Sequence, residues 1–366
     1  MAEDLRSAGH KVDLLVFHEG NRIDMEDIAI HRIPSLPGIA GIGPGFSLKK
    51  LFCDFFMLFK AVHLCRKYDY DVIHAVEESV YIAAFLKLIF KKPYIYDVDS
   101  WMSEQLIEKF PLLRSLSRPF VFCETRAVCF CDAAVVVCQA LEEKVLAIDA
   151  ECRVLRLEDV SLLEEVTGQY ESLKKIVQNN DGIILYVGNL EKYQGIDLLL
   201  ESYRQYTSCG GQASLVVIGG DEKGREKYLK RAEGLAIGSR VFFIGTRPLE
   251  HLGMYLQQAD VLVSPRTEGD NTPMKIYSYM ASGMPIVATR IKSHTQILSD
   301  ETAFLTDVDA KAMSARFHEA FADGKRAELV GKAARKKAEE KYSRAAYRKK
   351  IRDFYSELSH VWNLRN

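Results

Sequence analysis

The sequence predicts an α/β protein made of two doubly wound domains with a ligand cleft between them. Ten short apolar runs alternate with helical patterns along almost the whole chain. Runs without polar interruption are typical of parallel strands buried on both faces, and helices between them indicate right-handed βαβ crossovers. A length of 366 residues also suits about two domains.

Each predicted strand belongs to one of two series. The first comprises residues 10–17, 28–34, 70–76, 93–99 and 132–138, and the second comprises residues 181–189, 213–220, 240–246, 260–265 and 284–289. The polar stretch 156–181 lies between the series and is the predicted linker. Because ligands of doubly wound sheets bind beyond the carboxyl ends of strands, we expect functional residues in the loops after these runs.

The beginning of the chain departs from this pattern. Residues 1–9 predict a helix that ends at Gly9 and leads into the first predicted strand. A doubly wound domain ordinarily opens with a strand and a Gly-rich turn before that helix. We therefore expect the first strand and the Gly-rich loop of the N-terminal sheet to be missing. A chain that starts at Met1 would then leave strand edges unpaired and tend to aggregate.

Composition argues against several classes of function. The formal net charge of −1 gives no basic field for nucleic acid. The eight cysteines lack the spacing of a metal site, so we expect no metal and a reduced, cytoplasmic protein. No signal peptide is evident, and no uncharged apolar run approaches the ~18 residues of a spanning helix.

Residues 47–68 predict an unusually apolar helix with basic residues around it. These are Lys49, Lys50, Lys60, Arg66 and Lys67. One interpretation is an ordinary crossover helix buried against the sheet. The other is a basic amphipathic helix that lies on an anionic membrane surface. The sequence leaves both open.

A polar cluster follows the predicted strand at 260–265 and precedes a predicted helix that closes at Gly283. The cluster consists of Arg266, Glu268, Asp270, Asn271, Thr272 and Lys275. Because a helix N-terminus presents unpaired N–H groups and a partial positive charge, it favours an anionic ligand. The alternative is a surface loop that ends in a helix cap.

Five stretches, taken together and in order, resemble the retaining glycosyltransferases of family 4. They are "AEDLRSAGHKVDLLVF", "YVGNLEKYQGIDLLLESY", "GTRPLEHLGMYLQQADVLVSPRTEG", "NTPMKIYSYMASGMPIVAT" and "KYSRAAYRKKIRDFYSEL". The resemblance implies the GT-B architecture of two Rossmann-like domains with an interdomain cleft. It implies an acceptor-side domain at 1–160, a nucleotide-sugar domain at 161–343 and a helix at 344–366 that crosses back to the first domain.

The resemblance implies transfer of a sugar from a nucleotide-diphosphate donor, of the UDP or GDP type, to a hydroxyl acceptor. Such an enzyme would act in the synthesis of cell-surface polysaccharides or glycoconjugates, without a metal or other cofactor. Helix N-termini and basic side chains would stabilise the departing diphosphate. Lipid-linked acceptors are common in the family, so the resemblance keeps open a lipid-linked acceptor and a contact of residues 47–68 with the inner membrane face. Without its first strand, a chain that starts at Met1 is expected to be inactive.

On the donor side, the resemblance assigns roles to four loops. Glu268 aligns with a catalytic glutamate near the donor sugar. The donor and diphosphate residues would be Gly188, Asn189, Lys192, Gln194, Arg266, Gly269, Asp270, Asn271, Thr272, Lys275 and Ser278. Ser278 stands where the family has a ribose-binding glutamate, and a serine cannot accept bidentately. The nucleoside would contact Gly219, Gly220, Asp221, Thr246 and Arg247.

On the acceptor side, polar residues lie at strand ends of the first series. His74 and Asp99 are the catalytic candidates, and Glu77, Asp97 and Trp101 are the acceptor-side candidates. A lone histidine is more often structural than catalytic. An aspartate pair at a strand end is more typical of a functional site and could orient the attacking hydroxyl.

Two competing interpretations remain. The first is a non-catalytic binding or scaffold protein derived from the same fold, which the expected missing strand and the residues Asn189, Gln194 and Ser278 favour. The second is another GT-B enzyme, such as a non-hydrolysing sugar-nucleotide epimerase. The acidic and histidine pattern of that epimerase is not evident in the sequence.

Overall fold

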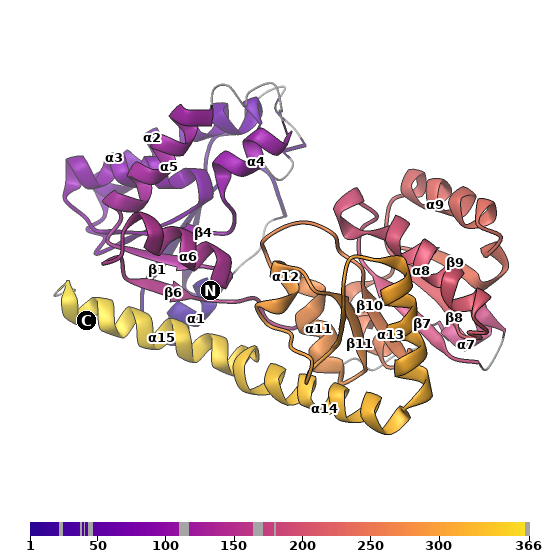
Figure 1. Ribbon diagram of the computed structural model, residues 1–366. Coiled ribbons are helices and arrows are strands. Elements are labelled where there is room, and N and C mark those ends of the chain that lie inside the picture. The colour runs from indigo at the N-terminus through magenta and orange to yellow at the C-terminus, as the bar shows by residue number, and fades with distance from the viewer. Residues whose placement is uncertain are drawn as a thin grey trace. The chain divides into compact units, whose positions relative to one another are not determined.

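The computed structural model describes residues 1–21, 25–36, 39, 41–42, 47–109, 117–163, 171–178 and 181–362. The chain divides into two compact units (Figure 1). The first unit comprises Met1–Glu158 and Tyr347–Asn366, and the second comprises Asp159–Ala346. Both units are mixed α/β structures with parallel strands, as the sequence predicted.

The second unit is built on one six-stranded parallel sheet of order β12-β11-β10-β7-β8-β9. Its strands are β7 (Ile183–Val187), β8 (Ser214–Ile218), β9 (Val241–Gly245), β10 (Val261–Ser264), β11 (Ile286–Thr289) and β12 (Phe304–Thr306). Every residue of β8, β10, β11 and β12 is buried, which explains the continuous apolar runs. Strands β7 and β10 are neighbours, so their carboxyl ends lie at the same edge of the sheet.

Helices cover both faces of this sheet. They are α7 (Leu173–Val177), α8 (Ile196–Ser208), α9 (Glu222–Gly234), α10 (Leu252–Leu256), α11 (Met274–Ser282), α12 (Lys292–Thr295), α13 (Ala310–Ala322) and α14 (Gly324–Lys341), with short 3₁₀ turns at Lys192–Gln194, Gly238–Arg240 and Leu249–His251. Helices α8, α9 and α13 contribute to one core cluster, α10 and α11 contribute to the other, and α14 contributes to both.

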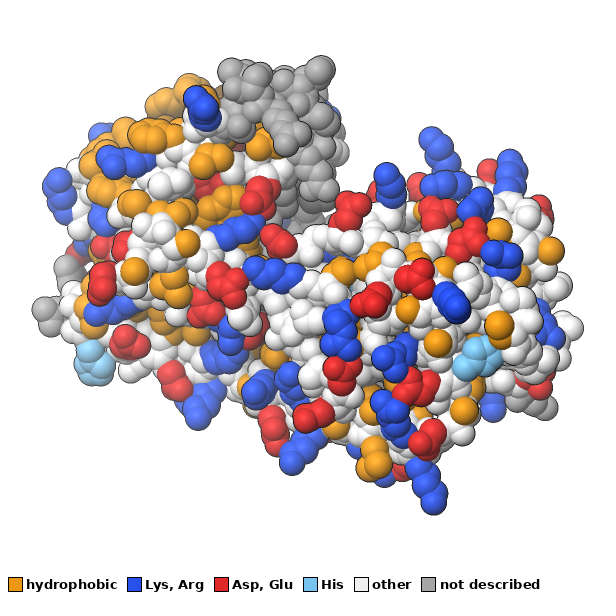
Figure 2. All heavy atoms as spheres, viewed as in Figure 1, with side chains coloured by type: hydrophobic (Ala, Val, Ile, Leu, Met, Phe, Trp, Pro, Cys, Tyr) orange, Lys and Arg blue, Asp and Glu red, His pale blue; other side chains and the backbone are white. Residues whose placement is uncertain are grey.

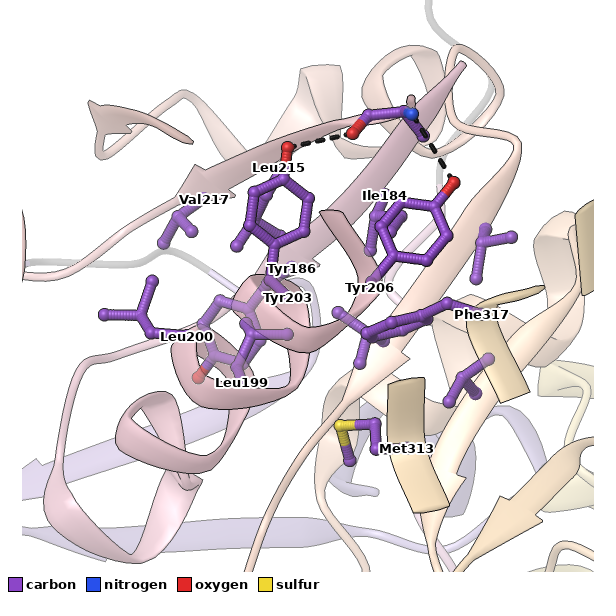
Figure 3. Packing of buried hydrophobic residues seen from close by; sticks show 14 of the residues in the cluster. Ile184, Tyr186, Leu199, Leu200, Tyr203, Tyr206, Leu215, Val217, Met313 and Phe317 are labelled. Atoms are coloured by element: carbon purple, nitrogen blue, oxygen red, sulfur yellow. Dashed lines mark hydrogen bonds between the residues drawn. The ribbon is translucent and has the colours of Figure 1, made fainter. Parts of the chain in front are cut away.

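Tyrosines of α8 lie in the first of these cores (Figure 3). The hydroxyl of Tyr203 donates to the carbonyl oxygen of Ala213 at 2.9 Å, and the hydroxyl of Tyr206 accepts from the N–H of Ala213 at 3.4 Å. Buried tyrosines of this kind bury apolar area while their hydroxyls keep partners. The core is therefore fixed in register against the start of β8.

The first unit contains two separate parallel sheets among its described residues. Strand β1 (Val12–Val16) pairs with β2 (Ile28–Arg32), and the second sheet has the order β3-β4-β5-β6. Its strands are β3 (Ile73–Val76), β4 (Tyr94–Val98), β5 (Ala133–Val136) and β6 (Val154–Arg156). Strands β1 and β3 are each paired with another described strand on one side only. The expectation of a missing first strand stays a prediction.

The helices of the first unit are α1 (Ala2–Ser7), α2 (Leu48–Lys67), α3 (Val80–Phe90), α4 (Met102–Lys109), α5 (Ser117–Phe130), α6 (Gln139–Ile148) and most of α15 (Arg344–Val361), with a 3₁₀ turn at Glu77–Ser79. Helix α15 packs on β4 and β5, where Ile351 and Leu358 share a core with Ile95 and Val135. The last helix of the chain thus completes the core of the first unit.

All ten predicted strands are present, and the structure adds β6 and β12. Both have only three residues, too few for a periodic signal to be distinguished from a loop. Helix α11 ends as predicted at Gly283, which adopts a left-handed φ of 76°. No helix in the described ranges is long and apolar enough to cross a bilayer.

Candidate functional site

The loops after β7 and β10 form one packed unit. The N–H of Thr267 donates to the carbonyl oxygen of Tyr193 at 2.9 Å. Gly195 has a φ of 74°, and a β-carbon there would lie 1.9 Å from the carbonyl oxygen of Pro265. Only glycine fits both the left-handed conformation and this close approach. The neighbouring strands therefore bring the two predicted donor loops into direct backbone contact.

A pocket of about 450 Å³ lies at these loops, within the range of small-molecule sites. Its lining residues are Leu162, Val187, Gly188, Asn189, Tyr193, Gln194, Ile218, Arg247, Pro248, Leu249, Leu252, Tyr255, Arg266, Pro273, Met274, Lys275, Ser278 and Tyr279. Seven of the residues predicted for the donor site are among them. One end carries cations and amides, and the other end is mostly apolar.

Lys275 is half-buried in the first turn of α11 and lines the pocket. Nζ donates to the Oε1 atom of Gln194 at 2.8 Å and lies 4.0 Å from the ring centre of Tyr186. Neither of these contacts is a carboxylate, and no carboxylate among the described residues pairs with Lys275 to balance its charge. Burial, together with the positive charge of Arg266, holds the pKa of Lys275 well below its ordinary value. A cation in this position favours an incoming anion.

Arg266 organises the loop that follows β10. Its Nε donates to the carbonyl oxygen of Glu268 at 2.6 Å, and a terminal nitrogen donates to the carbonyl oxygen of Asn271 at 3.2 Å. The guanidinium also lies 5.1 Å from the ring centre of Tyr193. Arg266 thereby fixes the loop while its side chain lines the pocket.

The other predicted residues of this loop are not among the described residues that line the pocket. Glu268 and Gly269 are exposed, and the carbonyl of Asp270 accepts from Gln296 at 2.7 Å. Thr272 is buried, and its hydroxyl has no partner in the described structure. A buried hydroxyl without a partner at a helix entrance is costly unless a ligand or water satisfies it.

Ser278 is fully buried in the pocket wall. Its hydroxyl oxygen accepts from the N–H of Leu162 at 3.0 Å. Leu162 belongs to the predicted linker, and the neighbouring Leu163 packs against the core of the second unit. The first part of the linker is therefore a wall of the pocket, and it occupies one acceptor position of the serine.

The apolar end of the pocket is formed by residues after β9 and by α10. Arg247 is held there by Glu171 at 2.6 Å and by the carbonyl of Ile244. Thr246 and Lys192 are exposed outside the lining. Gly219 and Gly220 follow β8, where Gly219 approaches the carbonyl of Gly188.

Asp221 is exposed and caps α9, its carboxylate accepting from the N–H of Gly224 at 2.8 Å. This contact gives the side chain a role in the helix start. It lies after β8, outside the pocket lining within the described residues.

A buried polar network lies behind the Arg266 loop. The Nε2 atom of His294 lies 2.9 Å from the hydroxyl of Ser264, and Nδ1 lies 2.8 Å from the carbonyl of Thr289. The hydroxyl of Thr289 donates to the carbonyl of Arg266 at 2.5 Å. Burial lowers the pKa of His294 to about 4, so the ring is neutral at pH 7. This neutral network ties the loop to β10 and β11.

In the first unit, the structure brings His74 and Asp97 together. Nε2 of His74 lies 2.9 Å from a carboxylate oxygen of Asp97, and Nδ1 lies 2.6 Å from the hydroxyl of Tyr355 on α15. Both ring nitrogens are therefore engaged inside the unit. These contacts are those of a histidine that anchors α15 to β3 and β4.

Glu77 has the features of a functional carboxylate in the first unit. It follows β3 with a φ of 47°, a conformation that costs free energy in a non-glycine residue. Burial raises the pKa of Glu77, and the hydroxyl of Ser100 donates to its carboxylate at 2.9 Å. Asp99 is exposed after β4, and the ring of Trp101 lies 5.7 Å from Nζ of Lys144.

Sequence reasoning missed the tyrosines of the site, the buried histidine and Ser100. The hydroxyl of Tyr279 accepts from the N–H of Val187 at 2.8 Å, and Tyr186 lies under Lys275. The signal was present as Tyr186 in "YVGN" and Tyr279 in "MKIYSYM", because a buried tyrosine hydroxyl needs a hydrogen-bond partner. In the described ranges no group of His, Cys, Asp and Glu could hold a metal ion.

Comparison with known proteins places both units in one group. Residues 1–155 match Glycosyltransferase Family 4, and residues 170–337 match Glycosyl transferases group 1. A D-inositol 3-phosphate glycosyltransferase of Corynebacterium diphtheriae is 28% identical over 131 residues, covering 34% of this chain and 30% of that protein. A sulfoquinovosyl transferase of Arabidopsis thaliana is 26% identical over 185 residues, covering 49% of this chain and 34% of that protein. These matches span about a third of the length of the curated relatives.

Solved structures show the same fold. Sucrose-phosphate synthase from Thermosynechococcus elongatus has a TM-score of 0.76 at 20% identity, covering 98% of this chain and 92% of that one. HepE from Anabaena, in complex with UDP and glucose, has a TM-score of 0.67 at 17% identity, covering 90% and 86%. With family matches to both units and this shared fold, the chain belongs to the family 4 and group 1 glycosyltransferases of the GT-B architecture.

Proposed function

We propose that the protein is a retaining glycosyltransferase that moves a sugar from a nucleotide-diphosphate donor to a hydroxyl acceptor. The observation that carries this proposal is the half-buried Lys275 at the entrance of α11, which lines the pocket and has no carboxylate partner among the described residues. A diphosphate matches such a cation at a helix N-terminus. Family membership and the transferase names of the relatives support the same reaction class.

The diphosphate would lie between the two packed loops. Lys275 and Arg266 would supply the positive charge. The missing side chain of Gly188 leaves room for the ammonium group of Lys275, since a β-carbon there would lie 2.7 Å from its Nζ. As the bond from the sugar to the diphosphate breaks, negative charge grows on the leaving oxygen. Fixed cations and helix N–H groups then stabilise the transition state more than the ground state.

The sugar would lie beside Glu268 and the 270–272 backbone, at the mouth of the pocket. The nucleoside would occupy the apolar end, near Arg247 and Leu249. We propose a UDP donor, with GDP as the second choice, because related structures contain UDP and glucose and the pocket is modest in size. The other residues predicted to contact the nucleoside lie outside the pocket lining and would reach it only if the pocket widens on binding. They are Gly219, Gly220, Asp221 and Thr246.

The acceptor would bind to the first unit. Glu77, held by Ser100, is the residue that we assign to the acceptor hydroxyl, with Asp99 and Trp101 near it in sequence. We assign His74 and Asp97 to positioning, because their contacts with Tyr355 and with each other lie within the unit. We further propose a cytoplasmic enzyme of cell-surface polysaccharide or glycoconjugate synthesis. Its acceptor would be lipid-linked, and residues 47–68 would contact the inner membrane face.

Two observations favour a second candidate, a protein that binds nucleotide without transferring sugar. Ser278 stands in for a carboxylate, and its hydroxyl already accepts from Leu162. Lys275 donates to Gln194, an amide at a place where the family has a basic residue. Both departures would weaken the hold on the donor without removing the pocket.

Calorimetry with UDP and GDP tests the proposal. Binding at a hundredfold excess over Kd should stabilise the protein by about 2.7 kcal/mol. Because burial depresses the pKa of Lys275 and an adjacent diphosphate would raise it, binding should take up protons and its heat should depend on the buffer. Lys275→Met should abolish the proton uptake, and Lys223→Met on the exposed start of α9 should not.

Turnover of UDP-sugars then separates the two candidates. Nucleotide binding together with donor hydrolysis or transfer supports the enzyme. Nucleotide binding without turnover of any donor, in the presence of candidate acceptors, supports the binding protein. If neither UDP nor GDP shifts the melting temperature, both candidate functions are contradicted.

A further inference from the structure

A broad apolar face covers three helices of the first unit, and the donor pocket does not use it. Nineteen large hydrophobic side chains are exposed among the described residues, and eleven of them belong to α2, α3 and α5. The eleven are Leu51, Phe52, Phe55, Phe59, Tyr81, Phe85, Leu88, Ile89, Val121, Phe122 and Phe130. Isolated exposed hydrophobic residues are ordinary, whereas a contiguous group marks an interaction surface.

The three helices are neighbours, since α2 packs on α3 and α3 packs on α5. Figure 2 shows hydrophobic side chains gathered over this part of the first unit. We call the exposed residues of α2, α3 and α5 the outer face. Because all three helices belong to the same unit, the outer face is defined without reference to the second unit.

Helix α2 is apolar on two opposite sides. Cys53, Met57 and Ala61 form its buried stripe, while Phe55 and Phe59 on the other side are 54% and 59% exposed. The rings of Phe55 and Phe59 pack edge to face at 4.8 Å. A helix that is hydrophobic all round is ordinarily covered on all sides. Both interpretations of residues 47–68 therefore find support: one side is a core helix, and the other has the character of a docking surface.

The outer face is basic as well as apolar. The three helices contain eight basic residues, namely Lys49, Lys50, Lys60, Arg66, Lys67, Lys87, Arg118 and Arg126, and only two acidic residues, Asp54 and Glu124. The whole chain, by contrast, has 49 basic and 50 acidic residues. Positive charge is thus concentrated on these helices while the rest of the protein is acidic.

The two acidic residues offset only a small part of this charge. Glu124 is 1% exposed, and its carboxylate accepts from the backbone N–H of Met102 at 2.8 Å and from the hydroxyl of Ser103 at 2.6 Å. Burial raises the pKa of Asp54 to about 6, which still leaves this carboxylate mostly ionised at pH 7. At the margins of the face, Lys50 pairs with Glu78 and Lys87 pairs with Asp132.

We propose that the outer face docks on an anionic lipid bilayer, with the helices lying in the plane of the surface. Phenylalanine rings enter the boundary between headgroups and acyl chains, and Lys and Arg side chains contact anionic headgroups. A protein partner fits less well, because lysine is depleted at protein–protein interfaces. The absence of a spanning helix from the described ranges agrees with a surface position.

This inference deepens the proposed function and rests on it for one point, that a lipid-linked acceptor would be reached there. It extends the membrane contact from residues 47–68 to a face of three helices with a defined lipid chemistry. Binding to vesicles requires neither donor nor acceptor, so the two proposals can fail separately.

Co-flotation of the full chain with vesicles tests the inference. The protein should float with phosphatidylcholine vesicles that contain phosphatidylglycerol, should bind pure phosphatidylcholine far less, and should be released by salt. The triple variant Phe55→Ser, Phe59→Ser, Phe122→Ser and the triple variant Lys60→Gln, Arg66→Gln, Arg126→Gln should each lower the partition coefficient by about tenfold or more.

Matched controls come from the second unit, where Leu329 on α14 is 68% exposed and Lys230 on α9 is also exposed. Leu329→Ser and Lys230→Gln should leave flotation unchanged. Every variant should keep the melting temperature and the UDP affinity of the unaltered chain, which excludes misfolding.

Three results would overturn the inference. The unaltered chain could remain unbound to anionic vesicles, or both triple variants could float as well as it does. Alternatively, light scattering could show a dimer that the phenylalanine variant converts to a monomer without any change in lipid binding. That last outcome would assign the outer face to a second copy of the chain.

Discussion

The two units use the same kind of strands and helices but complete their sheets differently. The second unit has one six-stranded sheet, whereas the six strands of the first unit are divided between a pair and a group of four. Of the nineteen exposed large hydrophobic residues described, fifteen lie in the first unit and four in the second. Two of those four, Leu249 and Met274, line the pocket.

The difference separates a self-sufficient unit from one that depends on other surfaces. In the second unit, only four large apolar residues are exposed among those described, and a ligand in the pocket would cover two of them. In the first, strand edges and a helical face remain uncovered among the described residues, and the core is completed by α15 from the end of the chain. The second unit should therefore carry stability and donor binding, and the first should respond to partners.

Separating the units should have the largest effect. The fragment 159–346 should unfold cooperatively and bind UDP as the full chain does, because its sheet and both its cores lie within it. The fragment 1–158 should not fold, since it lacks the α15 residues Ile351, Phe354 and Leu358. Circular dichroism melting and calorimetry of both fragments would measure this. A stable first fragment beside an unfolded second one would reverse the comparison.

Removing the carboxylate of Glu268 should affect turnover only. Glu268→Gln should lower sugar transfer by about 100- to 1,000-fold, as loss of one electrostatic contact to a transition state does. UDP affinity should hardly change, because the carboxylate is exposed beside the pocket and absent from its lining. Steady-state kinetics and calorimetry would measure the two effects, with Glu226→Gln on α9 as control. Equal loss of both would mean that Glu268 holds the loop.

Acid should weaken the second unit relative to the first. Burial lowers the pKa of His294 from 6.5 to about 4. Between pH 6.5 and pH 4, the imidazole therefore binds a proton in the unfolded chain and stays neutral in the native protein. Stability is then complete above pH 6.5 and falls by about 3 kcal/mol as the pH drops to 4. Asp54 acts oppositely in the first unit. Its raised pKa, about 6 against 3.8, adds stability as the pH falls through that interval.

Scanning calorimetry between pH 7 and pH 4 would follow the two transitions, with UDP identifying that of the second unit. His294→Gln should flatten the pH dependence of that transition. If the transition kept the same slope in the variant as in the unaltered chain, other groups would control it.

The smallest effect tests the contact between the donor loops. Gly195 and Gly210 both have positive φ, at 74° and 89°, but a β-carbon at Gly210 would meet no atom within 4 Å. Gly210→Ala should cost only the conformational strain, ~1–2 kcal/mol. Gly195→Ala should cost a further ~1–3 kcal/mol from the clash with Pro265 and should weaken UDP binding. Urea unfolding and calorimetry would compare the variants, and equal losses would show that the loops can separate.

The strands were predictable because buried parallel strands leave continuous apolar runs, and only the three-residue β6 and β12 escaped. Arg266 and Lys275 were predictable from their place after a strand and at a helix start. His294 was not, because its partners Ser264 and Thr289 come from two different strands. The exposure of Phe55 and Phe59 could not be predicted from the sequence either, because both sides of α2 are apolar and the pattern does not show which side is buried.

Ser278 shows why the candidate site could be predicted only in part. Its contact with a nucleotide stays a prediction, and the structure shows the residue in the wall of the pocket. Its bond to Leu162 depends on the path of the linker across the second unit, which no local pattern encodes. Positions along one element follow from periodicity, whereas contacts between distant segments require the folded chain.

The close approach of Gly195 to Pro265 has a consequence for the thermodynamics of binding. A loop that becomes ordered only when its ligand arrives loses backbone entropy at that moment, ~1–2 kcal/mol for each residue that is fixed. Here the two donor loops already hold each other through the backbone when the unit folds. The entropy of ordering them is therefore part of the folding free energy, and the contacts with the donor remain available for affinity and for discrimination between nucleotides.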